Sequence, residues 1–210
     1  MNYFIGLMMS FLFATHCYAD NALPAGAIKV DKGTNEKCVE FISYKGEMYC
    51  TITPTNKIPF NTGLLAFDKQ VIQFDNRPWK AAWVKNTAEV FTIEYIPVGE
   101  EIDNWQELVT SQFIAGLQDV TPVAFYGRFK EKLDKAGISY TIHTIEETPE
   151  FFLFEFKVAK PDSLQQDELQ KVVKHSNGMY ILHYAMKKAD MGEENRRKWI
   201  INLKESTIKP

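Results

Sequence analysis

The segment Phe151–Val158 reads FFLFEFKV, and no other stretch of the chain is as aromatic or as strand-like. Its side chains alternate, so one face of a strand would be wholly apolar and the opposite face mixed. The apolar face would comprise Phe152, Phe154, Phe156 and Val158. This period-2 pattern predicts a strand near the middle of a sheet whose core face is covered.

Predicted hairpins supply the neighbours of this strand. The dipeptide Asn177-Gly178 predicts a tight turn within the segment from about Leu169 to Met186. Residues 79–85 and 89–96 predict a second hairpin, and residues 138–145 predict a further strand. Strands joined by hairpins pair antiparallel, so we expect a mostly antiparallel sheet.

Three apolar stripes recur at helical spacing. The first predicted helix begins at Asp103 and ends near Gly116, the second lies between Thr121 and Gly137, and the third spans Glu193–Glu205. The stripe of the first comprises Trp105, Leu108, Val109 and Phe113. Helices before and after a run of strands predict an α+β fold in which helices pack on the sheet faces, an α/β/α sandwich.

The region from Ala88 to Glu205 resembles the PsbP-like α/β/α sandwich. The resemblance rests on the strand Phe91–Ile96, the following Pro97-Val98-Gly99 and the segment opening with Asn104-Trp105. These features are similar to those of small, signal-bearing bacterial proteins. The resemblance implies a noncatalytic, exported accessory domain, although a fold by itself does not determine a function.

The N-terminus predicts a signal peptide. Residues 4–14 form an apolar run that is too short to span a bilayer about 30 Å thick. Small residues at Cys17 and Ala19 predict cleavage after Ala19, which leaves no transmembrane helix in the mature chain. An uncleaved anchor is one alternative. A lipoprotein modified at Cys17 is another, but His16 stands where a small residue is required.

The mature chain would retain two cysteines, Cys38 and Cys50, which predict a disulfide in an exported protein. They flank a hairpin whose turn falls at Lys45-Gly46. A two-residue turn there would place Cys50 opposite Phe41, about 10 Å from Cys38 and beyond disulfide reach. Either the turn is centred nearer Tyr44 or the bond is absent, and we favour the bond.

Length and composition indicate a folded globular chain. The 210 residues are 45% hydrophobic and 24% charged, which favours one domain with an N-terminal elaboration. The predicted divisions are a signal peptide (1–19), a loosely ordered lead-in (20–37), an N-terminal β-hairpin with turns (38–62) and an α+β domain (63–210). The net charge of −3 is spread along the chain, which argues against nucleic-acid binding and a polybasic membrane patch.

No familiar catalytic, phosphate-binding or metal-binding motif occurs in the sequence. A two-residue turn at Asn177-Gly178 would place His175 and His183 on opposite faces, and His143 lies elsewhere. A three-residue turn would leave His175 and His183 about 13 Å apart. We therefore predict no catalytic, cofactor or metal site.

Paired acids occur at turns or at a helix start, where solvation explains them: Glu100-Glu101, Glu146-Glu147 and Glu193-Glu194. The run Arg196-Arg197-Lys198 fits a solvated helix face better than an anion site. Aromatic residues exceed what the predicted core needs. If Trp79, Trp83 and Phe151 were exposed together, they would form a binding surface.

These features favour an exported noncatalytic module, periplasmic or secreted, that binds a protein partner or a small apolar ligand without a cofactor. The alternatives are a hydrolase-type enzyme with an unrecognised site, for instance around His143 or His183, and a secreted factor acting on a host cell.

Overall fold

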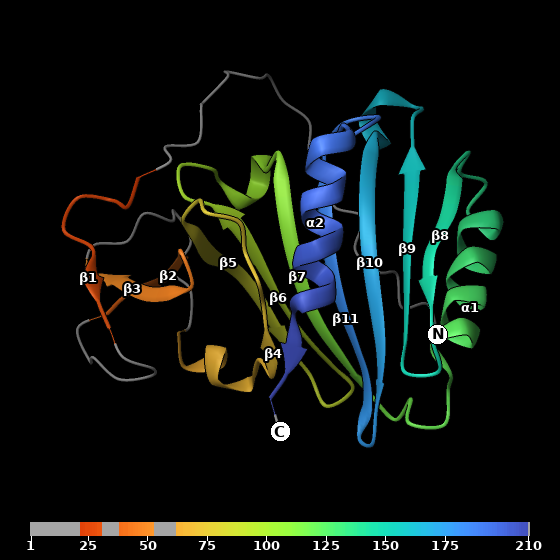
Figure 1. Ribbon diagram of the computed structural model, residues 1–210, viewed down its shortest axis with the longest axis horizontal. Coiled ribbons are helices and arrows are strands. Elements are labelled where there is room, and N and C mark those ends of the chain that lie inside the picture. The colour runs from red at the N-terminus through yellow and green to blue at the C-terminus, as the bar shows by residue number, and fades with distance from the viewer. Residues whose placement is uncertain (1–21, 31–37, 53–61, 210) are drawn as a thin grey trace.

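A large antiparallel sheet dominates the computed structural model, which describes residues 22–30, 38–52 and 62–209 (Figure 1). The strand order is β1-β3-β2-β5-β6-β7-β11-β10-β9-β8, and every neighbouring pair is antiparallel. The ten strands are β1 (Ile28–Lys29), β2 (Glu40–Tyr44), β3 (Glu47–Thr51), β5 (Trp79–Asn86), β6 (Val90–Pro97), β7 (Glu107–Ala115), β8 (Thr141–Glu147), β9 (Phe151–Val158), β10 (Gln166–His175) and β11 (Gly178–Met186).

The remaining elements are short. Strands β4 (Gln70–Val71) and β12 (Thr207–Ile208) pair as a separate two-stranded sheet. The α-helices are α1 (Pro122–Lys135) and α2 (Glu193–Glu205), and the 3-10 helices are η1 (Thr62–Phe67), η2 (Ile102–Asn104) and η3 (Asp162–Leu164).

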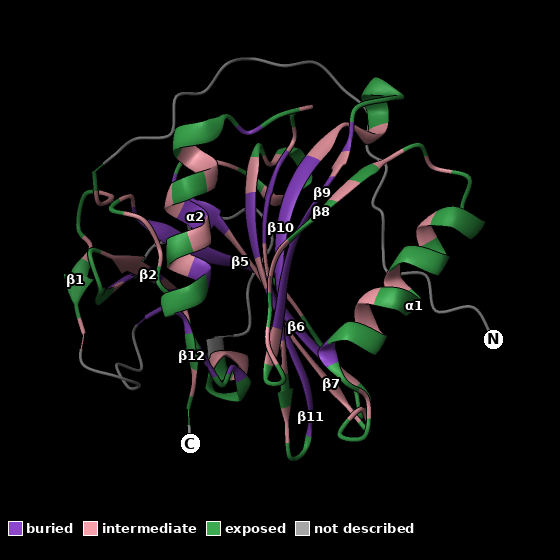
Figure 2. Cartoon of the chain, turned by 45° about the vertical axis from the view of Figure 1, so that its right-hand side comes forward, coloured by how far each residue is buried: buried purple, intermediate pink, exposed green. Residues whose placement is uncertain are grey.

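The two α-helices pack on opposite faces of the sheet, where strand alternation divides the core (Figure 2). On the α2 face, Trp199 and Leu203 pack with Leu153 of β9. On the α1 face, Phe125 and Phe129 pack against the opposite side of β9. The β9 residues of that side are Phe152, Phe154, Phe156 and Val158, so both faces of this strand are buried.

The predicted α/β/α sandwich is wrong. The described residues hold two short α-helices on a ten-stranded sheet, and neither helix forms a layer across it. The helix predicted from Asp103 to Gly116 is replaced by η2 and strand β7. Its apolar stripe fits a helix, but residues 107–115 also include the β-branched Val109, Thr110 and Ile114. The segment pairs with β6 on one side and with β11 on the other, which favours the strand over the helix.

Local sequence signals correctly predicted α1, α2 and the strand β9. Thr121 caps α1 by accepting a hydrogen bond from the backbone N–H of Ala124, and α2 and β9 have the predicted bounds. The hairpin turn is shifted by one residue, because His175 pairs with Gly178. Glycine is required at Gly178 by close packing, since a Cβ there would lie 2.3 Å from the carbonyl oxygen of Ile114.

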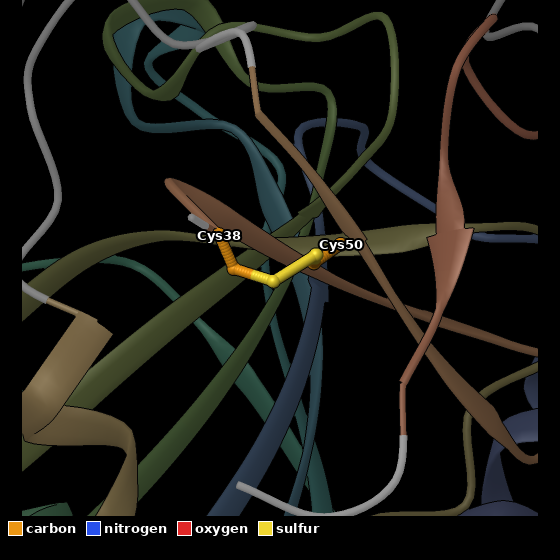
Figure 3. The surroundings of a disulfide bond; sticks show 2 residues. All are labelled: Cys38 and Cys50. Carbon is orange, nitrogen blue, oxygen red and sulfur yellow. A yellow bond between two sulfur atoms is a disulfide. The ribbon is translucent and has the colours of Figure 1, made fainter. Parts of the chain in front are cut away.

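The predicted disulfide between Cys38 and Cys50 is present, with the two Cα atoms 5.6 Å apart (Figure 3). The hairpin also turns at Lys45-Gly46, with Phe41 opposite Cys50. The prediction that a turn at Lys45-Gly46 excludes the disulfide is therefore wrong. The chain bends at Val39, before β2 begins, and Cys38 is not held on the strand line that the distance argument assumed. The predicted signal peptide lies outside the described residues.

Candidate functional site

A row of four polar side chains crosses the middle of the α1 face. Glu94 of β6 pairs with Thr110 of β7, Thr110 with His183 of β11, and His183 with Gln170 of β10. Gln170 lies opposite Phe154, which packs toward α1, so the row belongs to the α1 face. Directly paired side chains have Cβ atoms about 5 Å apart. We call these four residues the polar row.

Glu168 orients the histidine of the polar row. Its Oε1 lies 2.6 Å from His183 Nδ1 and accepts a hydrogen bond from Gln170 Nε2, also at 2.6 Å. Gln166 donates to the other carboxylate oxygen. Because an ionised carboxylate only accepts, Nδ1 of His183 carries the proton. In the neutral ring, Nε2 is then a free acceptor.

His183 Nε2 is buried and has no hydrogen-bond partner among the described residues. Three other buried side-chain atoms share this state: Asp167 Oδ1, Trp199 Nε1 and Asn202 Nδ2. Those three belong to α2 or to the sheet face beneath it. Within the described ranges, His183 Nε2 is therefore the unpaired buried atom of the α1 face.

Glu94, at one end of the polar row, lacks a close counter-charge. It is half-buried, and no hydrogen bond or ion pair joins it to another described residue. Burial raises the pKa of its carboxyl group, and His183 opposes that change only when its ring is protonated. The row therefore combines an acceptor at His183 with a carboxyl group that takes up a proton more readily than usual.

Apolar side chains border the polar row on the same face. Leu108 and Ile96 lie beyond it in one direction along the strands, and Ile181 lies in the other. Trp83 lies opposite Glu94 and is 36% exposed. The site is a polar strip with apolar borders.

The three predicted surface aromatics do not form one patch. Trp79 is fully buried on the α2 face, stacked on Phe74 and in contact with Trp199. Phe151 is half-buried on the same face, beneath Lys171 Nζ. Trp83 lies on the α1 face, because a register shift between Ala81 and Trp83 interrupts the alternation of β5.

The other predicted features are dispersed. His143 of β8 pairs with Glu155 of β9, and His175, at the end of β10, contacts Asn177. His175 and His183 point to opposite faces, although the turn is shifted. Across the described segments, no three His, Cys, Asp or Glu side chains are grouped so that they could hold a metal ion.

Sequence reasoning considered His183 but missed its partners. Glu94, Thr110, Glu168 and Gln170 belong to no motif, and their proximity depends on strand register. One signal was available: Gln166, Glu168 and Gln170 alternate with Asp167 and Leu169, at the start of a strand that was expected to begin only near Leu169. Three polar residues on one side of an internal strand indicate a polar strip on that face.

The charged groups of the α2 face are paired instead. Arg77 donates to both carboxylate oxygens of Glu107, at 2.7 and 2.6 Å, and also bonds Asp75. Burial alone would raise the pKa of Asp75, but bonds from Arg77, Trp79 and Lys198 outweigh it and lower the pKa to about 2.

A second network joins the start of α2 to the sheet through Arg196. This side chain bonds Glu155 and Asp167, and its Nη2 also lies 2.8 Å from Asp190. Lys157 reaches the same three carboxylates. Burial and the neighbouring Glu155 raise the pKa of Asp167 to about 6.

A protein-family model matches residues 67–209, and the chain belongs to that family. The matched range contains the polar row, both α-helices and seven strands of the large sheet, β5 to β11. The N-terminal hairpin and its disulfide precede it. The match does not connect the chain to the PsbP-like fold, and no curated protein matches the chain.

No described helix is both long enough and apolar enough to cross a membrane.

Proposed function

We propose that this chain is an exported binding module without catalytic activity of its own. Its ligand, a protein partner or a small and largely apolar molecule, would lie over the polar row. One observation carries the proposal: His183 Nε2 is buried and unpaired while Glu168 fixes Nδ1 of the same ring. A buried polar atom without a partner costs about 1–3 kcal/mol, which a bound ligand would recover.

The arrangement favours a ligand with one hydrogen-bonding group on an apolar body. A hydroxyl, amide or carboxyl group could donate to His183 Nε2. A protonated Glu94 could donate to an acceptor on the same group, since burial raises the pKa of Glu94. The apolar body would contact Trp83, which lies beside Glu94 and is 36% exposed. Few oriented polar groups within an apolar surface are typical of ligand sites.

Export is supported by the disulfide and by the N-terminal sequence. Disulfides persist in oxidising compartments and are rare in the cytosol. The Cys38–Cys50 bond therefore fits a periplasmic or secreted location, as does the predicted signal peptide cleaved after Ala19.

A hydrolase-type enzyme is the second candidate, and the Glu168–His183 pair favours it. A carboxylate that orients a histidine leaves the far ring nitrogen free to act as a general base. Thr110 pairs directly with His183 across the strands and offers a hydroxyl, although no hydrogen bond joins the two side chains. The binding proposal ranks higher because the nucleophile is not engaged.

Native mass spectrometry of protein recovered from the exported fraction tests the proposal. We expect the mass of residues 20–210 less two hydrogens, with an additional bound species. His183→Gln should lose that species, whereas His143→Gln, at an exposed histidine, should keep it. Retention by His183→Gln would refute the site. Hydrolysis of model esters that His183→Gln abolishes would favour the enzyme.

A further inference from the structure

A hollow lies where the N-terminal hairpin, the segment after β4 and helix α2 meet. Its volume is about 460 Å³, and its lining residues are Tyr44, Lys45, Asp75, Asn76, Arg77 and Lys198. We call it the basic groove. Hollows of this size accept small organic ligands. Asp75, Arg77 and Lys198 belong to the α2-face network, so the groove is separate from the polar row.

Among the described residues that line the basic groove, cations outnumber acids. Lys45, Arg77 and Lys198 face one carboxylate, that of Asp75. The Asp75 side chain is only 6% exposed and accepts hydrogen bonds from Arg77, Trp79 and Lys198. Its charge is therefore covered by donors. Even with Glu107 behind Arg77, the lining keeps a net positive charge.

Two of the three cations are held in place before any ligand binds. Arg77 is clamped between Asp75 and Glu107, with N–O distances of 2.8 and 2.6 Å. Lys198 Nζ lies 2.9 Å from Asp75 Oδ2. Side chains that are already ordered lose little conformational freedom when they bind a ligand.

The third cation occupies an unusual backbone conformation. Lys45 has a φ of 51°, in the left-handed region, as the first residue of the two-residue turn between β2 and β3. Asn, Asp or Gly normally fills this position, because the conformation is disfavoured for other residues. Lys45 Nζ lies 5.0 Å from the Tyr44 ring centroid, beside the groove. A disfavoured conformation at a ligand-sized hollow suggests a functional side chain.

We propose that the basic groove binds a small organic anion, with a carboxylate or phosphate group beside Lys45 and Lys198 and an apolar part against Tyr44. The aromatic ring and the lysine that lies over it offer one apolar and one charged contact side by side. The donors of Arg77 are engaged by Asp75 and Glu107. Arg77 therefore contributes positive charge to the groove without a direct hydrogen bond to the ligand.

Titrations of the ¹⁵N-labelled mature chain, followed by NMR, test this proposal. The probes are phenyl phosphate, benzoate, inorganic phosphate and the neutral benzyl alcohol. We expect the two aromatic anions to shift the amide signals of residues 44–45 and 75–77, and benzyl alcohol to leave them unchanged. The stronger of the two anions identifies the preferred group. Inorganic phosphate reports the contribution of the charge alone.

Matched variants sharpen the test. Lys45→Asn keeps a residue that tolerates the left-handed turn but removes the charge, and Lys198→Met keeps an apolar stem. Each should weaken aromatic-anion binding about fivefold. Arg197→Gln, at an exposed cation on α2 that does not line the groove, should change it less than about twofold. Equal affinity in Lys45→Asn and wild type, equal binding of benzyl alcohol, or shifts centred elsewhere would overturn the proposal.

Discussion

The two faces of the sheet differ in how their buried carboxylates are neutralised. On the α2 face, Asp75, Glu107, Glu155 and Asp167 each lie within ion-pair distance of an arginine or lysine. On the α1 face, Glu94 has no such partner among the described residues, and His183 Nε2 is unpaired. Charges that are paired hold α2 and the loops on the sheet. In the proposed function, Glu94 and His183 are the groups that a ligand would engage.

The largest effect that would test this division comes from the α2 core. Trp199 is fully buried, stacks on Tyr184 with ring centroids 3.9 Å apart and touches Trp79. Trp199→Ala should lower the free energy of unfolding by about 4 kcal/mol, measured by urea denaturation. Trp83→Ala, on the α1 face and 36% exposed, should lower it by less than about 1 kcal/mol. Equal losses of unfolding free energy in the two variants would contradict the proposed difference between the two faces.

Arg196 tests whether the paired charges support the fold. Arg196→Met leaves Glu155 and Asp167 buried, with Lys157 as their only counter-charge among the described residues. We expect a loss of about 2–3 kcal/mol in urea denaturation, because removing one partner strands the others. Arg197→Met, at an exposed neighbour, should stay within about 0.5 kcal/mol of wild type. If the two variants were equally stable, the ion pairs of Arg196 would make no measurable contribution to the stability of the fold.

The pH dependence of stability tests the same network through Asp167. Its pKa is raised from 3.8 to about 6 in the folded chain, so the folded state binds the proton more tightly. The resulting stabilisation is complete below 3.8 and is lost as the pH rises through about 6. Asp167→Asn should remove this decline, as measured by thermal unfolding between these pH values. An unchanged profile would show that another group is responsible.

The sequence predicted those parts of the fold that local chemistry controls. Thr121 and Pro122 set the start of α1, and the alternation of Phe151–Val158 set β9. The sequence prediction failed for residues 107–115, where a helical apolar stripe coexists with β-branched side chains. Pairing with β6 and β11 decides between them, and neither partner is visible from the segment itself.

The candidate site depended on strand register and was therefore largely hidden. Glu94 and His183 are 89 positions apart in sequence and meet because β6, β7 and β11 align them around Thr110. Trp79 and Trp83, named together as a possible binding surface, lie on opposite faces because the register of β5 shifts after Ala81. Register shifts of this kind leave no reliable sequence signature.

The most direct test of the claim that the polar row is a ligand site has the smallest expected effect. It compares the unfolding free energy of wild type and Glu94→Gln at pH 7 and about pH 4, by urea denaturation of the ligand-free chain. Burial raises the pKa of Glu94 above 4.5. Any stability from this group is therefore present at low pH and lost as the pH rises through its folded pKa.

We predict that Glu94→Gln is more stable than wild type at pH 7, by about 0.5–1 kcal/mol, because it removes a half-buried charge without a partner. Near pH 4 the difference should narrow, since wild-type Glu94 is then largely protonated. A variant less stable than wild type at pH 7 would mean that Glu94 supports the fold. The polar row would then stabilise the fold and would not be a ligand site.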